Sequence, residues 1–187
     1  MNEKSDWKKL TSGEVFKTPV FSIIRERSKS VRTGAETDFY FFKCPDWVNI
    51  IAVTKDNKLV MIKQYRHGSG RVEMEIPGGC IETNEDPVLA GERELFEETG
   101  YRGSRGRIIG KVCPNPALQG NNCYTILVTD ATKESEAAME ETETIETIPV
   151  PVEDVNDLIK EKKITHGLVL NALHFWTLNT TQKNQGE

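Results

Sequence analysis

A single segment, GGCIETNEDPVLAGERELFEETGY at residues 78–101, constrains the fold of this chain more than any other part of its sequence. Its composition indicates a glycine-rich loop followed by a helix. Asp86 can cap the free N–H groups at the start of that helix, and Pro87 suits its first position. Gly100 stops it, because glycine readily takes the left-handed conformation that ends helices. The segment therefore predicts a loop and then a capped helix.

Three carboxylates share one face of the predicted helix. Glu94, Glu97 and Glu98 fall within about a 100° arc, while apolar residues on the far side can face a core, namely Val88, Leu89, Leu95 and Phe96. Like charges this close destabilise a helix by roughly a few tenths of a kcal/mol per pair. Bound divalent cations would remove that cost, because hard cations prefer oxygen ligands. A solvated acidic face is the alternative interpretation of the same residues.

Alternating apolar residues elsewhere predict strands around this helix. The period-two segments are PVFSIIRERS, TDFYFFKC, WVNIIAVT and KLVMIKQY before it, and GRIIGKV, NCYTILVT and TIPVP after it. Helical spacing recurs in VEDVNDLIKEKKI and HGLVLNALHFWTL, and the acidic residues 130–146 are expected to form an exposed mobile loop. This order of elements indicates an α+β fold. Residues 1–45 are expected to form a strand region that packs on the main body or on another subunit. Residues 46–180 are expected to form the main domain, and residues 181–187 a frayed tail.

Composition excludes several classes of protein. The formal net charge of −5 and the pI near 5.4 are unlike those of a nucleic-acid-binding protein, which clusters Lys and Arg. No stretch approaches about eighteen apolar residues, and no signal-peptide core is present. The four cysteines show neither zinc nor disulfide spacing, which indicates free thiols in a reducing compartment. We therefore expect a cytoplasmic protein that binds neither nucleic acid nor membrane, and a small anionic ligand remains open.

The wider spacing of the acidic segment resembles a known signature. Reading from Gly79, five residues lead to Glu85, seven more lead to REL at 93–95, and one more leads to EETG at 97–100. This pattern is similar to the Nudix box of hydrolases that cleave nucleoside diphosphates linked to another group. Only Tyr101 departs from it, where the box more often has an aliphatic residue. The resemblance implies an α/β/α sandwich with a mixed sheet, and attack of water on a phosphoanhydride.

The same resemblance assigns roles to the acids. It implies Mg²⁺, or Mn²⁺ as an alternative, bound by Glu94, Glu98 and Glu97 with a main-chain carbonyl of the loop at Gly78. It also implies a bracing ion pair between Glu85 and Arg93. The cations would screen the phosphate oxygens and lower the pKa of the attacking water.

Features outside the box resemble the ADP-ribose and nucleoside-diphosphate-sugar pyrophosphatase branch of this family. They fall within residues 20–178 and comprise IKQYRHG, MEIPGG, Pro116 and KKITHGLVLNALHFW. By this resemblance Arg66 reaches the substrate phosphates and Glu75 lies near the sugar. Trp47 is a candidate for stacking on the base, although aromatic residues in strands also serve as core. For Arg66, the alternative is a solvated arginine at a strand end.

The sequence leaves the identity of the substrate open. The branch often has an acidic residue in the loop after the proline, and PNPALQGNNCY has none. The expected substrate is therefore a nucleoside diphosphate sugar in the wider sense, ADP-ribose and GDP-mannose among them. Hydrolysis of pool nucleotides or dinucleoside polyphosphates is an alternative, and a non-catalytic Nudix-like ligand sensor is another.

Two further expectations concern parts of the chain outside the box. In the resembling branch, a loop ahead of the penultimate helix supplies the general base, which points to Glu141, with Glu143 two residues on. Glu97 is the alternative candidate for the general base. The alternative interpretation of the loop acids is that they are solubilising surface charges. Residues 1–45 hold too little apolar material for a separate core and would leave sheet edges exposed, so a homodimer is expected.

Overall fold

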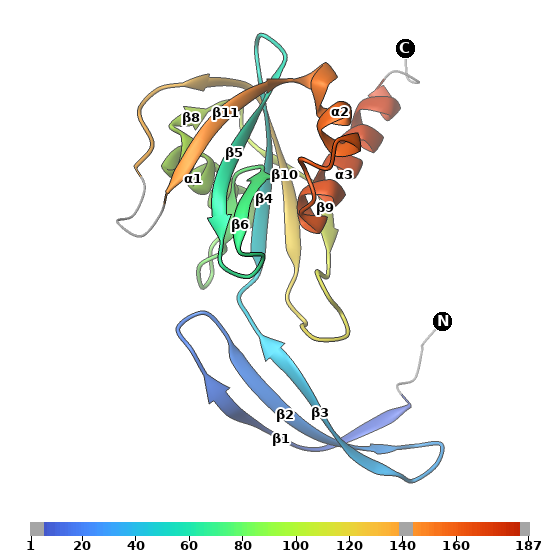
Figure 1. Ribbon diagram of the computed structural model, residues 1–187. Helices are drawn as coiled ribbons and strands as arrows, with labels where there is room; N and C mark the ends of the chain where they lie inside the picture. The colour runs from blue at the N-terminus through green and yellow to red at the C-terminus, as the bar shows by residue number, and fades with distance from the viewer. Residues whose placement is uncertain (1–5, 139–143, 184–187) are drawn as a thin grey trace. The chain divides into compact units, whose positions relative to one another are not determined.

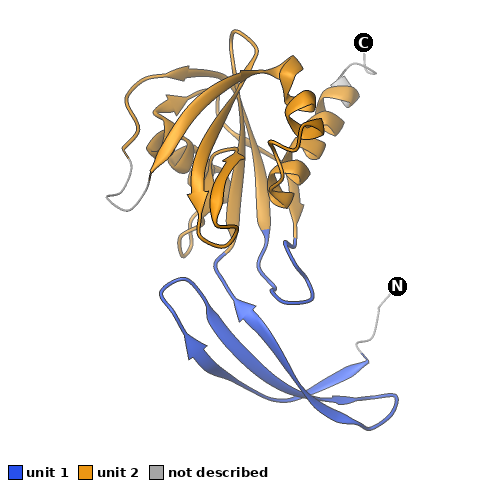
Figure 2. Ribbon diagram, in the orientation of Figure 1, with its two compact units in different colours: residues 1–45, 113–122 blue, residues 46–112, 123–187 orange. Residues whose placement is uncertain are grey.

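The computed structural model describes residues 6–138 and 144–183 (Figure 1). The chain divides into two compact units, coloured separately in Figure 2. Unit 1 comprises residues 1–45 and 113–122, and unit 2 comprises residues 46–112 and 123–187. Each unit is described by itself.

Unit 1 is a three-stranded antiparallel sheet in the order β1-β2-β3. Its strands are β1 (Trp7–Lys17), β2 (Ser22–Ser30) and β3 (Glu36–Lys43). The loop 113–122 joins this sheet where Phe42 N donates to Leu118 O at 2.7 Å. The sequence pattern indicated β2 and β3 but did not single out β1, whose exposed residues WKKLTSGEVFK have no clean alternation and whose pairing shifts register twice.

Unit 2 contains an eight-stranded mixed sheet. The strands along its main path are β11 (Ile145–Pro151), β5 (Lys58–Arg66), β4 (Trp47–Thr54), β10 (Cys123–Lys133) and β8 (Tyr101–Arg102). Three more pair beside them: β6 (Arg71–Glu75) on β5, β7 (Gly78–Cys80) on β4, and β9 (Arg107–Val112) on β10. The β4–β10 pairing is parallel and the other pairings are antiparallel.

Helices cover both faces of this sheet, as Figure 1 shows. On one face α1 (Pro87–Thr99) buries Ala90 and Leu95 in a cluster with residues of β4, β5 and β10, including Ile50 and Val60. On the other face α3 (Gly167–Lys183) and α2 (Val155–Lys160) pack on a second cluster that includes Ile51. Because Ile50 and Ile51 are both fully buried, neighbouring residues of β4 serve opposite cores. The α+β class and the α/β/α sandwich are confirmed.

Two predicted boundaries differ from the structure. The helix predicted over residues 152–164 is a 3-10 turn (Val152–Asp154) and the short α2, which ends at Lys160. Lys162 then takes a φ of 59°, and the chain turns so that Ile164 is buried. The loop predicted from residue 130 starts later, because β10 continues through a register shift to bury Ala131 and ends at Lys133. Among the described residues, no helix is long and apolar enough to cross a membrane.

Candidate active site

Local sequence signals position α1 as the wall of the site. The Asp86 side chain accepts hydrogen bonds from Val88 N at 2.9 Å and Leu89 N at 3.2 Å, which caps the helix start. Gly100 has a φ of 72° and donates to Phe96 O at 2.8 Å, which ends the helix. Both boundaries agree with the sequence prediction, and they fix which residues point away from the core.

The glycine pair lies directly against the acidic face of α1. Gly78 N donates to Glu98 Oε2 at 3.0 Å, and Glu98 is only 5% exposed. A Cβ at Gly79 would overlap the Glu94 carboxylate, and a Cβ at Gly78 would lie 2.5 Å from Val48 O. Close approach of the loop to the helix therefore requires Gly79, and its close approach to β4 requires Gly78.

Arg93 donates hydrogen bonds to three carboxylates around this loop. Its Nε donates to Glu85 Oε1 at 2.9 Å and its Nη2 donates to Glu85 Oε2 at 3.1 Å. Its Nη1 donates to Glu94 Oε1 and to Glu97 Oε2, each at 3.0 Å. The hydrogen bonds to Glu85 raise the pKa of Arg93 above its ordinary value, and Arg93 lowers the pKa of Glu85. Arg93 thus ties the loop to the helix and holds two acids of the acidic face.

The donor set on α1 suits a hard divalent cation. Glu94, Glu97 and Glu98 supply carboxylate oxygens, and the adjoining loop supplies main-chain carbonyls. Within residues 6–138 and 144–183, no three acidic, histidine or cysteine side chains already converge as a closed metal site. Glu94 and Glu97 are instead turned onto Arg93. The chemistry of the residues therefore fits a cation, while the carboxylates here have a cationic side chain as their partner.

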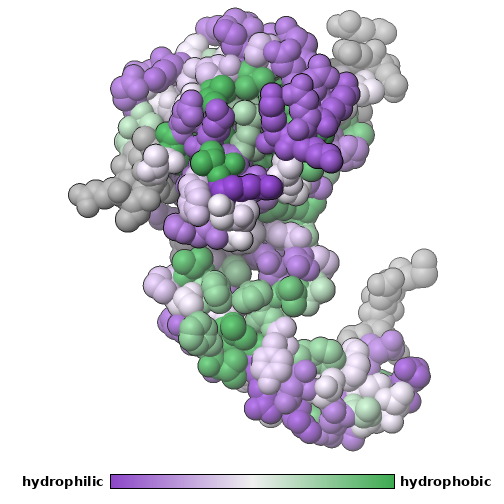
Figure 3. All heavy atoms as spheres, viewed as in Figure 1, coloured by the Kyte–Doolittle hydropathy of each residue, from purple (hydrophilic) through white to green (hydrophobic). Residues whose placement is uncertain are grey.

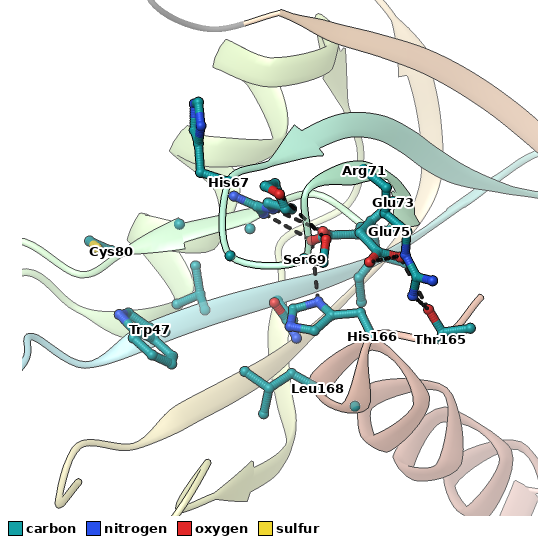
Figure 4. A pocket seen from close by; sticks show the side chains of 18 residues that line it. Trp47, His67, Ser69, Arg71, Glu73, Glu75, Cys80, Thr165, His166 and Leu168 are labelled. Atoms are coloured by element: carbon teal, nitrogen blue, oxygen red, sulfur yellow. Dashed lines mark hydrogen bonds and ion pairs between the residues drawn. The ribbon is translucent and has the colours of Figure 1, made fainter. Parts of the chain in front are cut away.

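A cavity of about 600 Å³ opens beside the glycine pair, and Figure 4 shows it from close by. Gly78 and Gly79 line it on one side, and Trp47 lines it from the start of β4. Arg66 and Glu75 line it from β5 and β6. The loop from residue 165 to Leu168 adds a further wall. The cavity therefore joins the box loop to the residues that the sequence assigned to substrate binding.

Arg66 and Glu75 form a close pair in the wall of this cavity. Arg66 Nε donates to Glu75 Oε1 at 2.8 Å and Nη2 donates to Oε2 at 2.9 Å. His166 Nδ1 lies 3.3 Å from Glu75 Oε2. Burial alone would raise the pKa of Glu75, but the hydrogen bonds from Arg66 and the charges of Arg66 and His166 lower it to about 2. Glu75 is therefore an ionised carboxylate held between two basic groups.

A second polar cluster lies beside the first. Arg71 Nε donates to Glu73 Oε1 at 2.8 Å, and Arg71 Nη2 donates to Thr165 Oγ1 at 2.9 Å. Thr165 Oγ1 in turn donates to Glu73 Oε2 at 3.1 Å. Strand β6 is thereby tied to the residues just before α3.

The structure brings most of the predicted site residues into one region. Trp47, Arg66 and Glu75 share the cavity with Gly78, and the acids of α1 lie against the glycine loop. Glu141 and Glu143 lie outside the described residues. Sequence reasoning missed Asn49, Arg71, Glu73, Thr165 and His166 as lining residues. The alternation R-V-E-M-E in β6 puts Arg71, Glu73 and Glu75 on one face, and that pattern could have revealed two of them.

The fold and the site define a sandwich protein with a carboxylate helix against a glycine loop that lines a cavity of about 600 Å³. Comparison with known families matches residues 45–173 to the NUDIX domain. The chain belongs to this family.

Similar proteins cover nearly the whole chain. A methanol dehydrogenase activator from Bacillus methanolicus is 28% identical over 94% of this chain and 92% of its own length. An ADP-ribose pyrophosphatase from Bacillus subtilis (strain 168) is 26% identical over 95% of this chain and 96% of its own. The crystal structure of an ADP compounds hydrolase superposes with a TM-score of 0.84 at 20% identity, covering 100% of this chain and 99% of that one. At that identity the likeness defines the fold.

Proposed function

We propose that this protein hydrolyses the pyrophosphate bond of nucleoside diphosphate sugars and releases a nucleoside monophosphate and a sugar phosphate. The observation that carries the proposal is the shared cavity, which is lined both by the box glycines and by the Arg66–Glu75 pair. A diphosphate in this cavity would lie beside a guanidinium and beside the carboxylate helix. The similarity to an ADP-ribose pyrophosphatase over 95% of the chain supports ADP-ribose as the first substrate to test.

Three side chains are proposed to bind the substrate. Arg66 would attract the phosphate oxygens, because guanidinium groups bind phosphate through charge and directed hydrogen bonds. Glu75 fixes the plane of that guanidinium, since both of its oxygens accept from Arg66. Trp47, whose ring is half-buried and lines the cavity, offers an aromatic face to a base.

The acidic face of α1 is proposed to hold Mg²⁺, with Mn²⁺ as a substitute. Glu94, Glu97 and Glu98 would be the ligands, together with the main-chain carbonyl of Gly78. A cation there supplies charge screening for the phosphate oxygens and a lower pKa for the attacking water. Arg93 bonds to one oxygen of Glu94 and one of Glu97, so a cation could be held by these acids beside Arg93, which keeps its two hydrogen bonds to Glu85.

The general base is proposed to be Glu141 or Glu143, because carboxylates that hold a cation are poor bases. Both residues lie outside the described part of the chain. The residues on either side support the proposal: Ala138 N donates to Glu97 O at 2.8 Å, and Ile145 pairs with Gln64, two residues from Arg66. Glu97 is the alternative base.

We also propose a homodimer that forms through unit 1. Of the fourteen large apolar residues that are exposed in the described part, nine belong to this unit: Trp7, Leu10, Val15, Phe16, Val20, Val31, Phe39, Tyr40 and Leu118. Figure 3 shows apolar side chains gathered over part of the surface of unit 1. Exposed apolar patches of this kind mark association surfaces.

One assay tests the reaction and the substrate class together. The protein is incubated with Mg²⁺ and, in separate reactions, ADP-ribose, GDP-mannose, ADP-glucose, NADH, diadenosine polyphosphates and nucleoside triphosphates, and products are identified by chromatography. The proposal expects AMP and ribose 5-phosphate from ADP-ribose, or the equivalent pair from another nucleoside diphosphate sugar. Preferential cleavage of triphosphates or dinucleoside polyphosphates would instead identify a nucleotide-pool hydrolase. Ligand binding without cleavage of any compound would identify a sensor.

A further inference from the structure

The residues immediately before α3 are tied to β6 at two neighbouring points. Thr165 Oγ1 donates to Glu73 Oε2 at 3.1 Å, and His166 Nδ1 lies 3.3 Å from Glu75 Oε2. The two acids are two residues apart on one strand, so consecutive residues of the loop meet alternate residues of β6. Figure 4 shows the His166 ring pointing at Glu75 across the cavity wall.

Glu75 stands between two basic side chains that both reach the cavity. Its side chain is 4% exposed, whereas those of Arg66 and His166 are 43% and 39% exposed. A buried carboxylate is tolerated only when charged or hydrogen-bonding partners surround it. Removing His166 would therefore leave Arg66 as the remaining basic partner of Glu75. The orientation of Arg66 would then depend on a carboxylate that has lost one of its two supports.

The surroundings of His166 Nδ1 differ from those of a histidine with a purely structural role. Its Nδ1 is buried, and among the described residues its one close polar contact is Glu75 Oε2 at 3.3 Å, which falls short of well-formed hydrogen-bond geometry. Buried polar atoms in native proteins usually have such a partner, so one without it needs a reason. The Glu75 carboxylate supplies that reason, because its negatively charged Oε2 faces Nδ1 at 3.3 Å.

We propose that His166 is a positioning residue for the reaction: it fixes the Glu75 carboxylate and, through it, the Arg66 guanidinium that faces the substrate phosphates. The proposal rests on the function proposed above. Thr165 and Glu73 hold the loop at the neighbouring point, so the start of α3 sets the geometry of this wall of the cavity.

The position of His166 predicts an effect on binding more than on the chemical step. Its contact with Glu75 belongs to the wall formed by β5 and β6, whereas the acids of α1 lie against the glycine loop. An interaction made equally with the bound substrate and the transition state changes KM and leaves kcat alone. His166 is expected to act in this way.

Kinetics with ADP-ribose and Mg²⁺ test the proposal. His166→Leu is expected to raise KM about fivefold or more with kcat within about twofold, and His166→Gln, which can donate to the same oxygen, is expected to restore KM to within about twofold of wild type. His174→Leu is the matched control, because His174 is exposed on α3, the helix that follows His166, and lines a different cavity. In an Arg66→Ala background, His166→Leu should have no further effect on KM. Additive effects in that background, or an unchanged KM, would overturn the proposal.

A second measurement does not depend on turnover. The ¹⁵N-resolved NMR signal of Arg66 Nε–H reports the hydrogen bond to Glu75, and it is expected to shift or broaden in His166→Leu but not in His174→Leu. If the protein cleaves none of the sugars and this signal still responds, the proposed function fails while the coupling of His166 to Arg66 stands. If the protein cleaves ADP-ribose and the signal does not respond, the coupling fails and the function stands.

Discussion

At the scale of single residues, the site depends on close contact between the glycine loop and helix α1. Gly79 leaves no room for a Cβ beside the Glu94 carboxylate, and Gly78 leaves none beside β4, so the loop backbone lies between the strand and the acidic face of α1. Glu98 is drawn into this contact and buried, although the sequence pattern alone suggested an exposed position. The acid with the strongest structural tie to the loop is therefore also a proposed cation ligand.

Glu98→Gln should separate this structural tie from catalysis. The amide oxygen of Gln can still accept from Gly78 N, so the free energy of unfolding should change by about 1 kcal/mol or less. The loss of a charged ligand should lower kcat by about two orders of magnitude or more. Glu92→Gln is the control, because Glu92 lies on the same helix and accepts from Gly106 N at 2.6 Å. Equal activity of the two variants would remove Glu98 from the ligand set.

Glu75 gives the second prediction at this scale, through the pH dependence of stability. Its folded pKa of about 2 lies below its ordinary value of 4.5, so its contribution is fully present above about pH 4.5 and is lost as pH falls toward 2. The shift corresponds to a contribution on the order of 3 kcal/mol. The free energy of unfolding of wild type and of Glu75→Gln, measured with denaturant and plotted against pH, should give curves that converge as pH falls through this window. Curves that stay parallel would show that Glu75 contributes nothing to acid lability.

At the scale of elements, the sequence predicted the helix ends and strands that depend on residues close together in the chain. The start and end of α1 follow from Asp86 and Gly100, whose caps involve neighbours along the chain. Strands β4 and β5 follow from apolar runs that are buried on both faces of the sheet. The predicted length of α2 was too great, because the chain turns to bury Ile164 despite the helical spacing of the residues before it.

The wall of the cavity could not be predicted in the same way. Thr165 contacts Glu73 across 92 positions and Arg71 across 94. Contacts at such separations depend on how the sheet and α3 pack, and no local pattern encodes them. The role of His166 could not be predicted from the sequence either, because its partner Glu75 is identified only by the fold.

The helix cap provides a prediction for α1. Asp86→Ala should lower the free energy of unfolding by about 1 kcal/mol, because two backbone N–H groups lose their acceptor. Asp154→Ala is the matched control, since Asp154 precedes α2 without a side-chain capping bond and should cost much less. Denaturant melts of both variants decide the matter, and equal losses would contradict the capping role.

The segment that carries the proposed base provides another prediction. Glu141→Gln or Glu143→Gln should lower kcat by well over threefold at saturating Mg²⁺ if that residue takes the proton from water. A change within about threefold in both variants, equivalent to roughly 0.7 kcal/mol or less in the barrier, would place the base elsewhere and make Glu97 the leading candidate. Glu136→Gln serves as the control, because its side chain is exposed and pairs with Lys133 in the described part of the same acidic stretch.

At the scale of the whole molecule, the two units differ in how they are stabilised. The buried apolar residues in the described part all belong to unit 2. Unit 1 buries polar side chains instead, including Ser28 and Asn121, and its three strands carry cross-strand ion pairs such as Arg25–Asp38. Exposed ion pairs contribute little stability, typically about 0–1 kcal/mol each. A sheet of this kind lacks a core, and a partner surface would supply the missing apolar burial.

The last prediction is that this partner is a second copy of the chain. Light scattering at micromolar concentration should give twice the chain mass of 21.1 kDa, about 42 kDa. Phe16→Lys, at a position 55% exposed in unit 1, should shift the mass toward the monomer, because a charge in an apolar interface must be desolvated. Leu178→Lys, at a similarly exposed position (48%) on α3 of unit 2, should leave the mass unchanged. A fully active monomer of wild type would refute the dimer.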